Sequence, residues 1–504
     1  MNAVELQQIS KHFGSVTAND AIDLEVKRGE IHCLLGENGA GKTTLMKILF
    51  GLYARDAGKI FINGRETEIH TPKDAIDQGI GMIHQHFMLV NRLTAAENII
   101  AGQEPKKGLL LDLKRARQQV AQLSQRYGLK VNPNAKIEDI SVGEQQRVEI
   151  LKALYRQAEI LILDEPTAVL TPQEVEELFQ VLQKLKDDSK TIIFITHKLK
   201  ETMAISDCIT VLRDGKKVGT VRTAETNPQE LARMMVGREV VLRVTKPDNQ
   251  PGQVIFESQN VCAVNKKNNV RLKDITMSLR QGEIVGIAGV EGNGQLELEE
   301  VFLGLRAIER GQLLLHNQPI QSVDTAGRRA SGMAHIPSDR LRRGLISSLT
   351  LEKNMILGSE WYPPFARHGI LSQKAITRFS QELIAAFQIR CSHSQEQVAS
   401  LSGGNQQKVI LARELSGDPQ VIIAAQPTRG VDVGAIEYIH NLLLAMRAQG
   451  KAILLISAEL DELKSLSDRI LVLYEGAIIA EGEAKEFTEQ ELGLLMAGHR
   501  KKAI

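Results

Sequence analysis

The chain has 504 residues, of which 43% are hydrophobic and 24% are charged. This length is too great for one hydrophobic core, so several domains are expected, and the composition is that of a folded globular protein. Because 62 basic residues balance 61 acidic ones, the sequence lacks the broad positive field with which proteins hold nucleic acid.

The cysteines and the apolar runs indicate a reducing compartment and no membrane span. The four cysteines are scattered without CxxC spacing, which excludes a disulfide framework and a zinc site, and we expect all four to be buried. No apolar run reaches the ~18 residues of a spanning helix, and the first residues lack a signal-peptide pattern. Any membrane contact is therefore expected through a partner.

Short apolar runs in the first half have the length and β-branched content of buried strands. They cover residues 31–35, 160–163 and 191–195. Residues 174–185 instead carry apolar side chains at three- and four-residue spacing, as on one face of a helix. Strands that alternate with helices predict an α/β fold with a mainly parallel sheet.

The strand at 31–35 runs directly into a loop that matches the pattern G-x-x-x-x-G-K-[ST]. The motif and the residue after it are Gly36, Glu37, Asn38, Gly39, Ala40, Gly41, Lys42, Thr43 and Thr44. Glycines let successive backbone N–H groups turn towards a phosphate, and the following helix adds its positive end. We predict that Lys42 binds the β- and γ-phosphates of a nucleotide and that Thr43 holds Mg²⁺.

The strand at 160–163 ends in two carboxylates, Asp164 and Glu165. Considered alone, such a pair before a proline is more typical of a helix-capping turn. Following a phosphate loop, it predicts that Asp164 joins the Mg²⁺ shell and that Glu165 deprotonates the attacking water. General-base catalysis of this kind accelerates a reaction by roughly 10²- to 10⁴-fold.

The second half of the chain repeats the first. Gly282 matches Gly29 at an offset of 253 (282 − 29), whereas Ser402 matches Ser141 at an offset of 261 (402 − 141). The second half therefore carries about eight extra residues, and we place them at 361–365. The polar, proline-containing segment 246–253 predicts a linker between a first domain, 1–245, and a second domain, 254–504.

The second half lacks the polar residues of the first half's site. Gln295 and Leu296 stand at the positions of Lys42 and Thr43. Four more replacements follow the same alignment: Ala425 for Asp164, Gln426 for Glu165, Ala458 for His197 and Ser338 for Gln85. We predict that this nucleotide site is degenerate.

In the first half, the phosphate loop and the carboxylate pair occur together with residues 140–147, which include Ser141-Val142-Gly143-Glu144-Gln145, and with Thr196-His197. This set resembles the ABC-type ATPases over nearly the whole chain. The resemblance implies two tandem P-loop NTPase domains of the ABC cassette type, each with a mainly parallel core sheet and a helical subdomain. It also implies ATP and Mg²⁺ as cofactors.

The resemblance assigns further roles in the first half. Gln85 corresponds to the Q-loop residue that contacts Mg²⁺ and ATP and senses the transmembrane partner, and His197 to the switch histidine, a catalytic residue. Phe13 corresponds to the aromatic that stacks on adenine, although by itself it fits a core position equally well. The second half has Val264-Asn265-Lys266 there, without an aromatic. His84 and His86 receive no role.

The family's signature motif, to which Ser141–Gln145 correspond in the first half and residues 401–408 in the second, shows the opposite asymmetry. The second half has a near-complete version, whereas the first half departs from the family at Val142 and Glu144. ABC cassettes pair head to tail as a family, so the resemblance implies that ATP on the first phosphate loop is capped by the second half. The capping residues are Ser402, Gly403, Gly404 and Asn405. One composite site would work and the other would be degenerate.

Fused cassettes with a degenerate second half resemble the ATPases of ribose-type sugar importers. Residues 81–90, 148–155 and 424–432 resemble the branch for nucleosides and related simple sugars, although Ser338 stands where the family usually has glutamate. The resemblance implies ATP hydrolysis that drives uptake of a nucleoside or simple sugar. The partners are two transmembrane permeases and, through them, a solute-binding lipoprotein, with the chain peripheral on the cytoplasmic face of the plasma membrane.

Two other functions remain open from the sequence. A soluble tandem ABC ATPase of the ribosome-associated type would also need no membrane span, but we would expect two working sites and a long charged linker. An ATP-dependent regulatory module would not require the intact set of Lys42, Asp164, Glu165 and His197.

Overall fold

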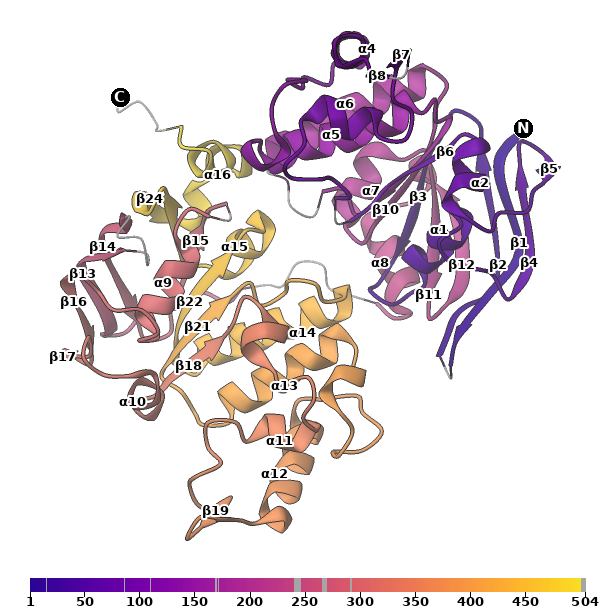
Figure 1. Ribbon diagram of the computed structural model, residues 1–504. Coiled ribbons are helices and arrows are strands. Elements are labelled where there is room, and N and C mark those ends of the chain that lie inside the picture. The colour runs from indigo at the N-terminus through magenta and orange to yellow at the C-terminus, as the bar shows by residue number, and fades with distance from the viewer. Residues whose placement is uncertain are drawn as a thin grey trace. The chain divides into compact units, whose positions relative to one another are not determined.

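The computed structural model divides into two compact units, Met1–Val240 (unit 1) and Val241–Ile504 (unit 2) (Figure 1). The structure describes residues 1–14, 16–85, 87–108, 110–167, 170, 172–239, 246–264, 270–290 and 292–499. His86, residues 241–245, Asn265 and Lys266, and residues 500–504 therefore lie outside the described residues. The domain limits 1–245 and 254–504 stay a prediction.

Unit 1 begins with a four-stranded antiparallel sheet in the order β2-β1-β4-β5. Its strands are β1 (Asn2–Phe13), β2 (Val16–Lys27), β4 (Ala57–Ile62) and β5 (Arg65–Glu66). Inward-facing aliphatic side chains of β1 and β2 are buried in one cluster with side chains of the core sheet. This packing fixes β1, which ends at Phe13, against the core of the unit.

The core sheet of unit 1 has the order β12-β11-β3-β10-β9-β6. Its strands are β3 (Ile31–Gly36), β6 (Ile80–Ile83), β9 (Ile160–Asp164), β10 (Thr191–Thr196), β11 (Cys208–Arg213) and β12 (Lys216–Arg222). All neighbours are parallel except β11 and β12. Because parallel strands end at the same edge, β3, β9 and β10 bring the phosphate loop, the carboxylates and His197 together.

Helices complete unit 1. They are α1 (Lys42–Leu49), α2 (Pro72–Asp77), α3 (Ala95–Ile100), α4 (Leu113–Tyr127), α5 (Val142–Tyr155), α6 (Pro172–Asp187), α7 (Leu199–Ile205) and α8 (Pro228–Val236). Helices α3, α4 and α5 pack against one another as a helical subdomain, which also carries the hairpin β7 (Lys106–Lys107) and β8 (Leu110–Leu111). Single 3₁₀ turns are η1 (Ile137–Asp139) and η2 (Thr223–Glu225).

Unit 2 repeats both sheets. The antiparallel sheet β14-β13-β16-β17 contains β13 (Val254–Val264), β14 (Val270–Arg280), β16 (Arg310–Leu315) and β17 (Gln318–Pro319). The core sheet β18-β21-β22-β15-β23-β24 contains β15 (Ile284–Ala288), β18 (Met333–Ile336), β21 (Val421–Ala425), β22 (Ala452–Ser457), β23 (Arg469–Tyr474) and β24 (Ala477–Glu483). The predicted α/β fold with mainly parallel core sheets is confirmed in both units.

The helices of unit 2 follow the same plan. They are α9 (Gln295–Phe302), α10 (Thr325–Ala330), α11 (Leu351–Met355), α12 (Gln373–Ala386), α13 (Gly403–Leu415), α14 (Val433–Ala448), α15 (Leu460–Leu466) and α16 (Glu489–Met496). Shorter elements are the π-helical turn Arg340–Gly344, the 3₁₀ turns Val398–Ser400 and Ala484–Glu486, and the hairpin β19 (Ala366–Arg367) and β20 (Ile370–Leu371).

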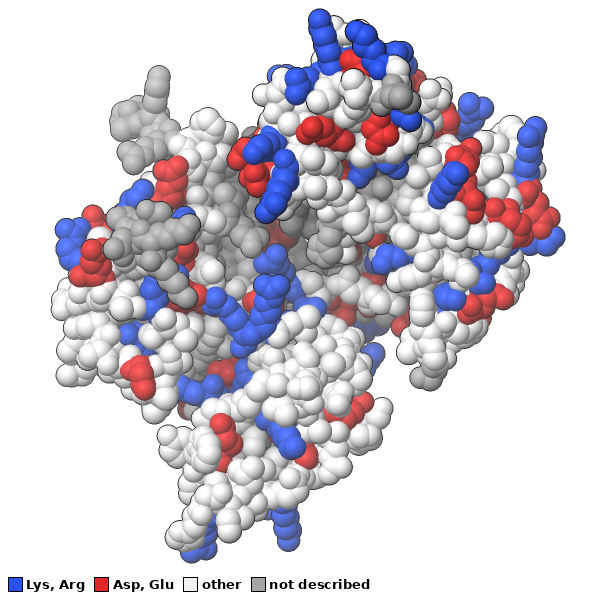
Figure 2. All heavy atoms as spheres, viewed as in Figure 1, with Lys and Arg blue, Asp and Glu red and all other residues white. Residues whose placement is uncertain are grey.

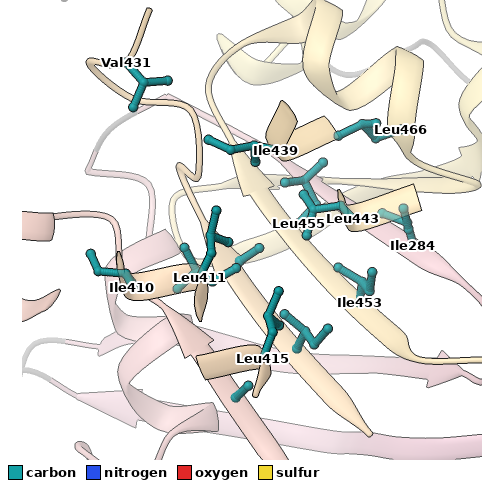
Figure 3. Close-up of a cluster of buried hydrophobic side chains, with 14 of the residues drawn as sticks. Ile284, Ile410, Leu411, Leu415, Val431, Ile439, Leu443, Ile453, Leu455 and Leu466 are labelled. Carbon is teal, nitrogen blue, oxygen red and sulfur yellow. The ribbon is translucent and has the colours of Figure 1, made fainter. Parts of the chain in front are cut away.

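The core of unit 2 lies between its central strands and the helices that cover them. Figure 3 shows side chains of α13, α14 and α15 around those of β15 and β22. Leu411 and Leu443, for example, are fully buried there together with Ile453 and Leu455. Helix α13 begins at the signature motif, so this packing fixes the motif to the sheet.

The extra residues of the second half are spread over three places. The caps of α3 and α11, Thr94 and Thr350, differ by 256 positions (350 − 94), and those of α4 and α12, Asp112 and Ser372, by 260 (372 − 112). The prediction of a single insertion at 361–365 was therefore wrong. Three residues enter before Thr350, four between Thr350 and Ser372, and one after Ser372.

The expectation that all four cysteines are buried was also wrong. Cys33 is buried, but Cys208, Cys262 and Cys391 are only half-buried. Cys208 is the first residue of β11, and Cys262 lies beside the exposed ion pair of Arg310 and Asp274. Positions near the ends of strands leave such residues within reach of solvent.

Segment 246–253 is held against unit 2 by polar contacts. Lys246 Nζ lies 3.3 Å from Asp468 Oδ1, and Asn249 Nδ2 donates to Gly282 O at 2.8 Å. The buried Arg447 donates to Pro247 O at 2.9 Å and to both carboxylate oxygens of Asp468 at 2.8 Å. The predicted linker is thus tied along most of its length to the unit that follows it.

We expect the substitution Arg447→Lys to loosen this segment. A lysine cannot reach both Asp468 oxygens and the Pro247 carbonyl at once, because it lacks the planar fork of a guanidinium. Loss of these bonds is expected to lower the free energy of unfolding of unit 2 by about 1 kcal/mol. Limited proteolysis should then cut faster within 246–253. The exposed Arg378→Gln serves as the control, and equal cleavage of both variants would contradict the assignment.

The length of the helices and the distribution of charged side chains both bear on which partners the chain can bind. Within the described residues, no helix has the length and apolarity required to cross a bilayer. On the face drawn in Figure 2, acidic and basic side chains are interspersed over both units, in keeping with the balanced composition.

Candidate active site

The phosphate loop of unit 1 is fixed at its base and open at its top. Gly41, the N-cap of α1, has φ 93°, and a Cβ there would lie 2.3 Å from Ala18 O, so only glycine fits. The buried Asn19 donates to Gly41 O at 3.1 Å. At Gly39 (φ 84°), by contrast, among the residues that the structure describes no atom beyond the adjoining residues lies within 4 Å of the Cβ position.

The remaining loop residues are divided between buried and exposed positions. Ala40 is buried and its N–H donates to Glu37 O at 3.1 Å, whereas Asn38 is exposed. Thr44 lies half-buried in the first turn of α1. The loop therefore has the curled backbone that the pattern predicts.

Lys42 is almost fully buried beneath the loop. Its Nζ donates to Gly36 O at 2.7 Å and to Glu37 O at 2.9 Å. Burial lowers the pKa of Lys42, while the charges of Glu165 and Asp164 act in the opposite direction. Carbonyl groups are weaker acceptors than phosphate oxygens, so this amine can exchange its present partners for those of an incoming nucleotide.

Thr43 and Asp164 meet at the end of β9. Thr43 Oγ1 donates to Asp164 Oδ1 at 3.1 Å, and the Asp164 side chain is buried. Burial raises the pKa of Asp164, and the hydrogen bond from Thr43 only partly offsets this effect. A hydroxyl and a carboxylate are hard oxygen ligands of the kind that Mg²⁺ prefers, so the residues present fit this ion.

Glu165 follows Asp164 in a left-handed backbone conformation. Its φ is 47°, and its N–H donates to Ile195 O at 3.0 Å. His197 Nδ1 lies 3.1 Å from Glu165 Oε1, and Gln85 Nε2 donates to Glu165 Oε2 in a long bond of 3.4 Å. The structure therefore brings the three residues together around one carboxylate.

The two neighbouring carboxylates are shifted in opposite directions. Burial acts to raise the pKa of Glu165, but the hydrogen bond with His197 and the charges of His197 and Lys42 outweigh it, so the pKa of Glu165 is lowered. The pKa of Asp164 is raised. Environments that separate two acids in this way are typical of assigned catalytic roles, and they keep Glu165 in the ionised form that a base requires.

Phe13 lies at the end of β1 with 45% of its surface exposed. Its ring meets that of Tyr53 edge to face, with centroids 5.4 Å apart, and Lys11 Nζ lies 5.5 Å from the Phe13 centroid. Phe13 is therefore a surface aromatic and not a core residue. Tyr53, which was not predicted from the sequence, enlarges the aromatic surface. The signal in the sequence was only a tyrosine four residues after the helix that follows the phosphate loop.

Unit 2 keeps the backbone of this site without its chemistry. Gln295, at the position of Lys42, donates to Val290 O at 2.8 Å, and Leu296 is exposed. Gln426 has φ 46°, and its N–H donates to Ile456 O at 2.7 Å, as Glu165 does to Ile195. Ala425 is buried beside it. The replacements changed the side chains and left the turns in place.

Both signature motifs begin a helix. Ser141 caps α5 and its Oγ accepts from Glu144 N at 3.3 Å, while Ser141 N donates to Glu144 Oε2 at 3.0 Å in a capping box. Ser402 caps α13 and accepts from Asn405 Nδ2 at 2.9 Å. Gly403 and Gly404 form the first turn of α13 in unit 2.

Comparison with known proteins gives the family. The ABC transporter family pattern matches residues 19–168 and 272–429. Over 98% of both chains, this chain is 47% identical to the "Nucleoside import ATP-binding protein NupA" of Lactococcus lactis subsp. cremoris. It is 50% identical over 99% of its length to the "Guanosine import ATP-binding protein NupO" of Bacillus subtilis, of which 98% is covered.

A third relative is the "Glucose import ATP-binding protein TsgD13" of Haloferax volcanii, 44% identical over 98% of this chain and 96% of that one. The family pattern matches twice, in the same two places where the structure repeats its core sheet. The resemblance drawn from the motifs is confirmed. The chain belongs to the ABC transporter family and contains two fused cassettes.

Proposed function

We propose that the chain hydrolyses ATP at the phosphate loop of unit 1 and thereby drives import of a nucleoside. The observation that carries the assignment is the convergence of His197 and Gln85 on Glu165, beside the Thr43–Asp164 contact. Unit 2 has the same backbone turn with Gln426, which cannot act as a base.

Each residue of the unit 1 site has a role in this reaction. Lys42 transfers its two hydrogen bonds from loop carbonyls to phosphate oxygens. Thr43, Asp164 and Gln85 would hold Mg²⁺, which neutralises phosphate charge when bound. Glu165 takes a proton from the water whose oxygen attacks the γ-phosphorus, and the bond to ADP breaks.

The remaining contacts of ATP are also part of the proposal. Phe13, with Tyr53 beside it, offers a surface on which adenine stacks. The second half supplies Ser402, Gly403, Gly404 and Asn405 to the γ-phosphate. This pairing follows from the asymmetry of the sequence, because the intact loop and the intact signature lie in different halves.

The solute class rests on the relatives. Those named for nucleoside and guanosine import are 47% and 50% identical to this chain, whereas those named for glucose and xylose import are 44% and 41% identical. A nucleoside is therefore the favoured solute. Two transmembrane permeases would bind the chain at the cytoplasmic face of the plasma membrane, and a solute-binding lipoprotein would deliver the nucleoside to them.

Uptake in cells tests this proposal. Deletion of the gene should abolish accumulation of radiolabelled guanosine, and wild-type protein should restore it while Glu165→Gln does not. Labelled xylose and glucose are supplied in parallel. Restoration of sugar uptake alone would overturn the solute class, and unchanged uptake of every solute would favour the ribosome-associated or regulatory alternatives.

A further inference from the structure

Strand β18 of unit 2 and the segment after it are held by carboxylates of α9. His335 Nε2 lies 2.9 Å from the buried Glu299 and Ser338 Oγ donates to it at 3.2 Å, whereas Arg343 donates to Glu300 at 2.7 Å. The same segment in unit 1 contains Gln85, which contacts Glu165. Unit 2 has therefore replaced a contact to the catalytic carboxylate by bonds within its own scaffold.

The segment after β18 continues into the π-helical turn Arg340–Gly344. This turn lies where unit 2 has three extra residues. Asp339 caps this turn by accepting from two of its N–H groups, at 3.1 Å and 3.0 Å. The first residue of the turn, Arg340, is partly buried, whereas the side chain of Arg342 is 89% exposed. The two arginines of one turn therefore face different surroundings.

The guanidinium of Arg340 lies between the signature motif and the turn at 429–430. Its Nη1 donates to Arg429 O at 2.9 Å. A Cβ on Gly403 would lie 2.7 Å from Arg340 Nη2 and 3.0 Å from Gly430 O, and a Cβ on Gly430 would lie 3.4 Å from Nη1. The absence of a side chain at Gly403 thus makes room for Arg340, whereas Gly430 has φ 67°, a conformation that favours glycine.

This arrangement places a cation at the positive end of a helix. Gly403 is the first residue of α13, and negative groups, not positive ones, are stabilised at such an end. Within the part of the chain that the structure describes, the buried Nε of Arg340 also has no hydrogen-bond partner. The cation at the helix N-terminus and the unbonded Nε are both unfavourable in the protein alone. An anion bound at the signature motif would offset the unfavourable position of the cation.

We propose that Arg340 is a positioning residue for ATP hydrolysis: it packs beside the signature residue Gly403 and, through its bond to Arg429 O, fixes the turn at Arg429 and Gly430 there, in the form in which the motif receives the γ-phosphate. The inference rests on the proposed pairing of the unit 1 phosphate loop with the unit 2 signature. Because the γ-phosphate is absent from ADP, Arg340 affects turnover and not the affinity for ADP.

The test compares Arg340→Gln with Arg342→Gln in the purified full chain. Both changes remove one positive charge from the same turn. Arg340→Gln is expected to lower kcat roughly 10-fold, as loss of a charge-assisted contact does, with the Kd for ADP and the melting temperature unchanged. Arg342→Gln should match the wild type. Arg340→Lys should recover only part of kcat, because the charge returns without the planar fork.

Glu165→Gln, measured alongside, separates this inference from the proposed function. If Glu165→Gln abolishes turnover while Arg340→Gln keeps the wild-type kcat, the role of Arg340 is overturned. If Glu165→Gln itself retains turnover, the proposed function fails instead. Should Arg340→Gln melt early, Arg340→Lys decides: a normal kcat in that variant shows that the fork has no role, and a reduced kcat at normal melting temperature supports it.

Discussion

Replacement of Glu165 by glutamine is expected to lower ATP turnover by about 10²-fold or more, while ATP still binds. The amide cannot take a proton from water, but Lys42 and the loop carbonyls that now hold it are unaffected. The left-handed turn also tolerates the change, because Gln426 occupies the same conformation in unit 2, with φ 46° against 47° for Glu165. The loss is therefore chemical and not structural.

Phosphate release and nucleotide affinity, measured on the same preparation, check this expectation. The matched control is Gln426→Glu, which places a carboxylate on the equivalent turn of unit 2 and should leave turnover unchanged, since Gln295 and Leu296 do not supply a phosphate cradle. Turnover close to that of the wild type in Glu165→Gln, or a gain in Gln426→Glu, would place the chemistry elsewhere.

The substitution Ser402→Ala, in the cassette without chemistry, is expected to lower kcat about 10- to 100-fold, as loss of a hydrogen bond to a charged group does. Ser141→Ala should change kcat less than threefold, since a bond of that kind is worth a full order of magnitude only where an anion is bound. Both serines cap a helix, so each alanine costs a similar stability of about 1 kcal/mol.

Substitutions of the two serines test the pairing of the halves more directly than substitutions of the signature glycines Gly143 and Gly404. A side chain at Gly143 would lie 2.4 Å from Glu174 Oε1, and one at Gly404 would lie 2.9 Å from Asp432 Oδ2. An aspartate at either position would therefore meet a carboxylate and disturb folding. The measurement is kcat per folded molecule for the two serine variants, with the melting temperature as control. Equal losses would show that the halves do not pair as proposed.

The fold and the first-half site were largely predictable from the sequence. The phosphate loop depends on backbone N–H groups and on a strand and helix that flank it, and all of these are local in the chain. Glu165 and His197 directly follow the neighbouring parallel strands β9 and β10, so their meeting follows from sheet topology. The replacements in unit 2 could also be predicted from the sequence, because the two halves of the repeat can be aligned with each other.

Other parts of the site depend on contacts between distant segments. Asn19 lies on β2, outside every motif, yet its amide supports Gly41. Arg340 contacts Arg429 and Gly403 across the fold, and no spacing rule joins these positions. The prediction that all four cysteines are buried failed for a related reason: composition does not show which residue begins a strand or lies beside an exposed ion pair.

The left-handed turn at Gln426 bears on how the backbone of the site relates to its catalytic side chain. A non-glycine residue in this conformation carries a conformational cost, yet unit 2 keeps the turn, with its N–H bonded to Ile456, although no base is left to aim. The catalytic side chain is therefore exchanged in unit 2 without a change of the backbone turn beneath it. Such a turn is held by its own N–H bond to the neighbouring strand, so it does not require the side chain that performs catalysis in unit 1.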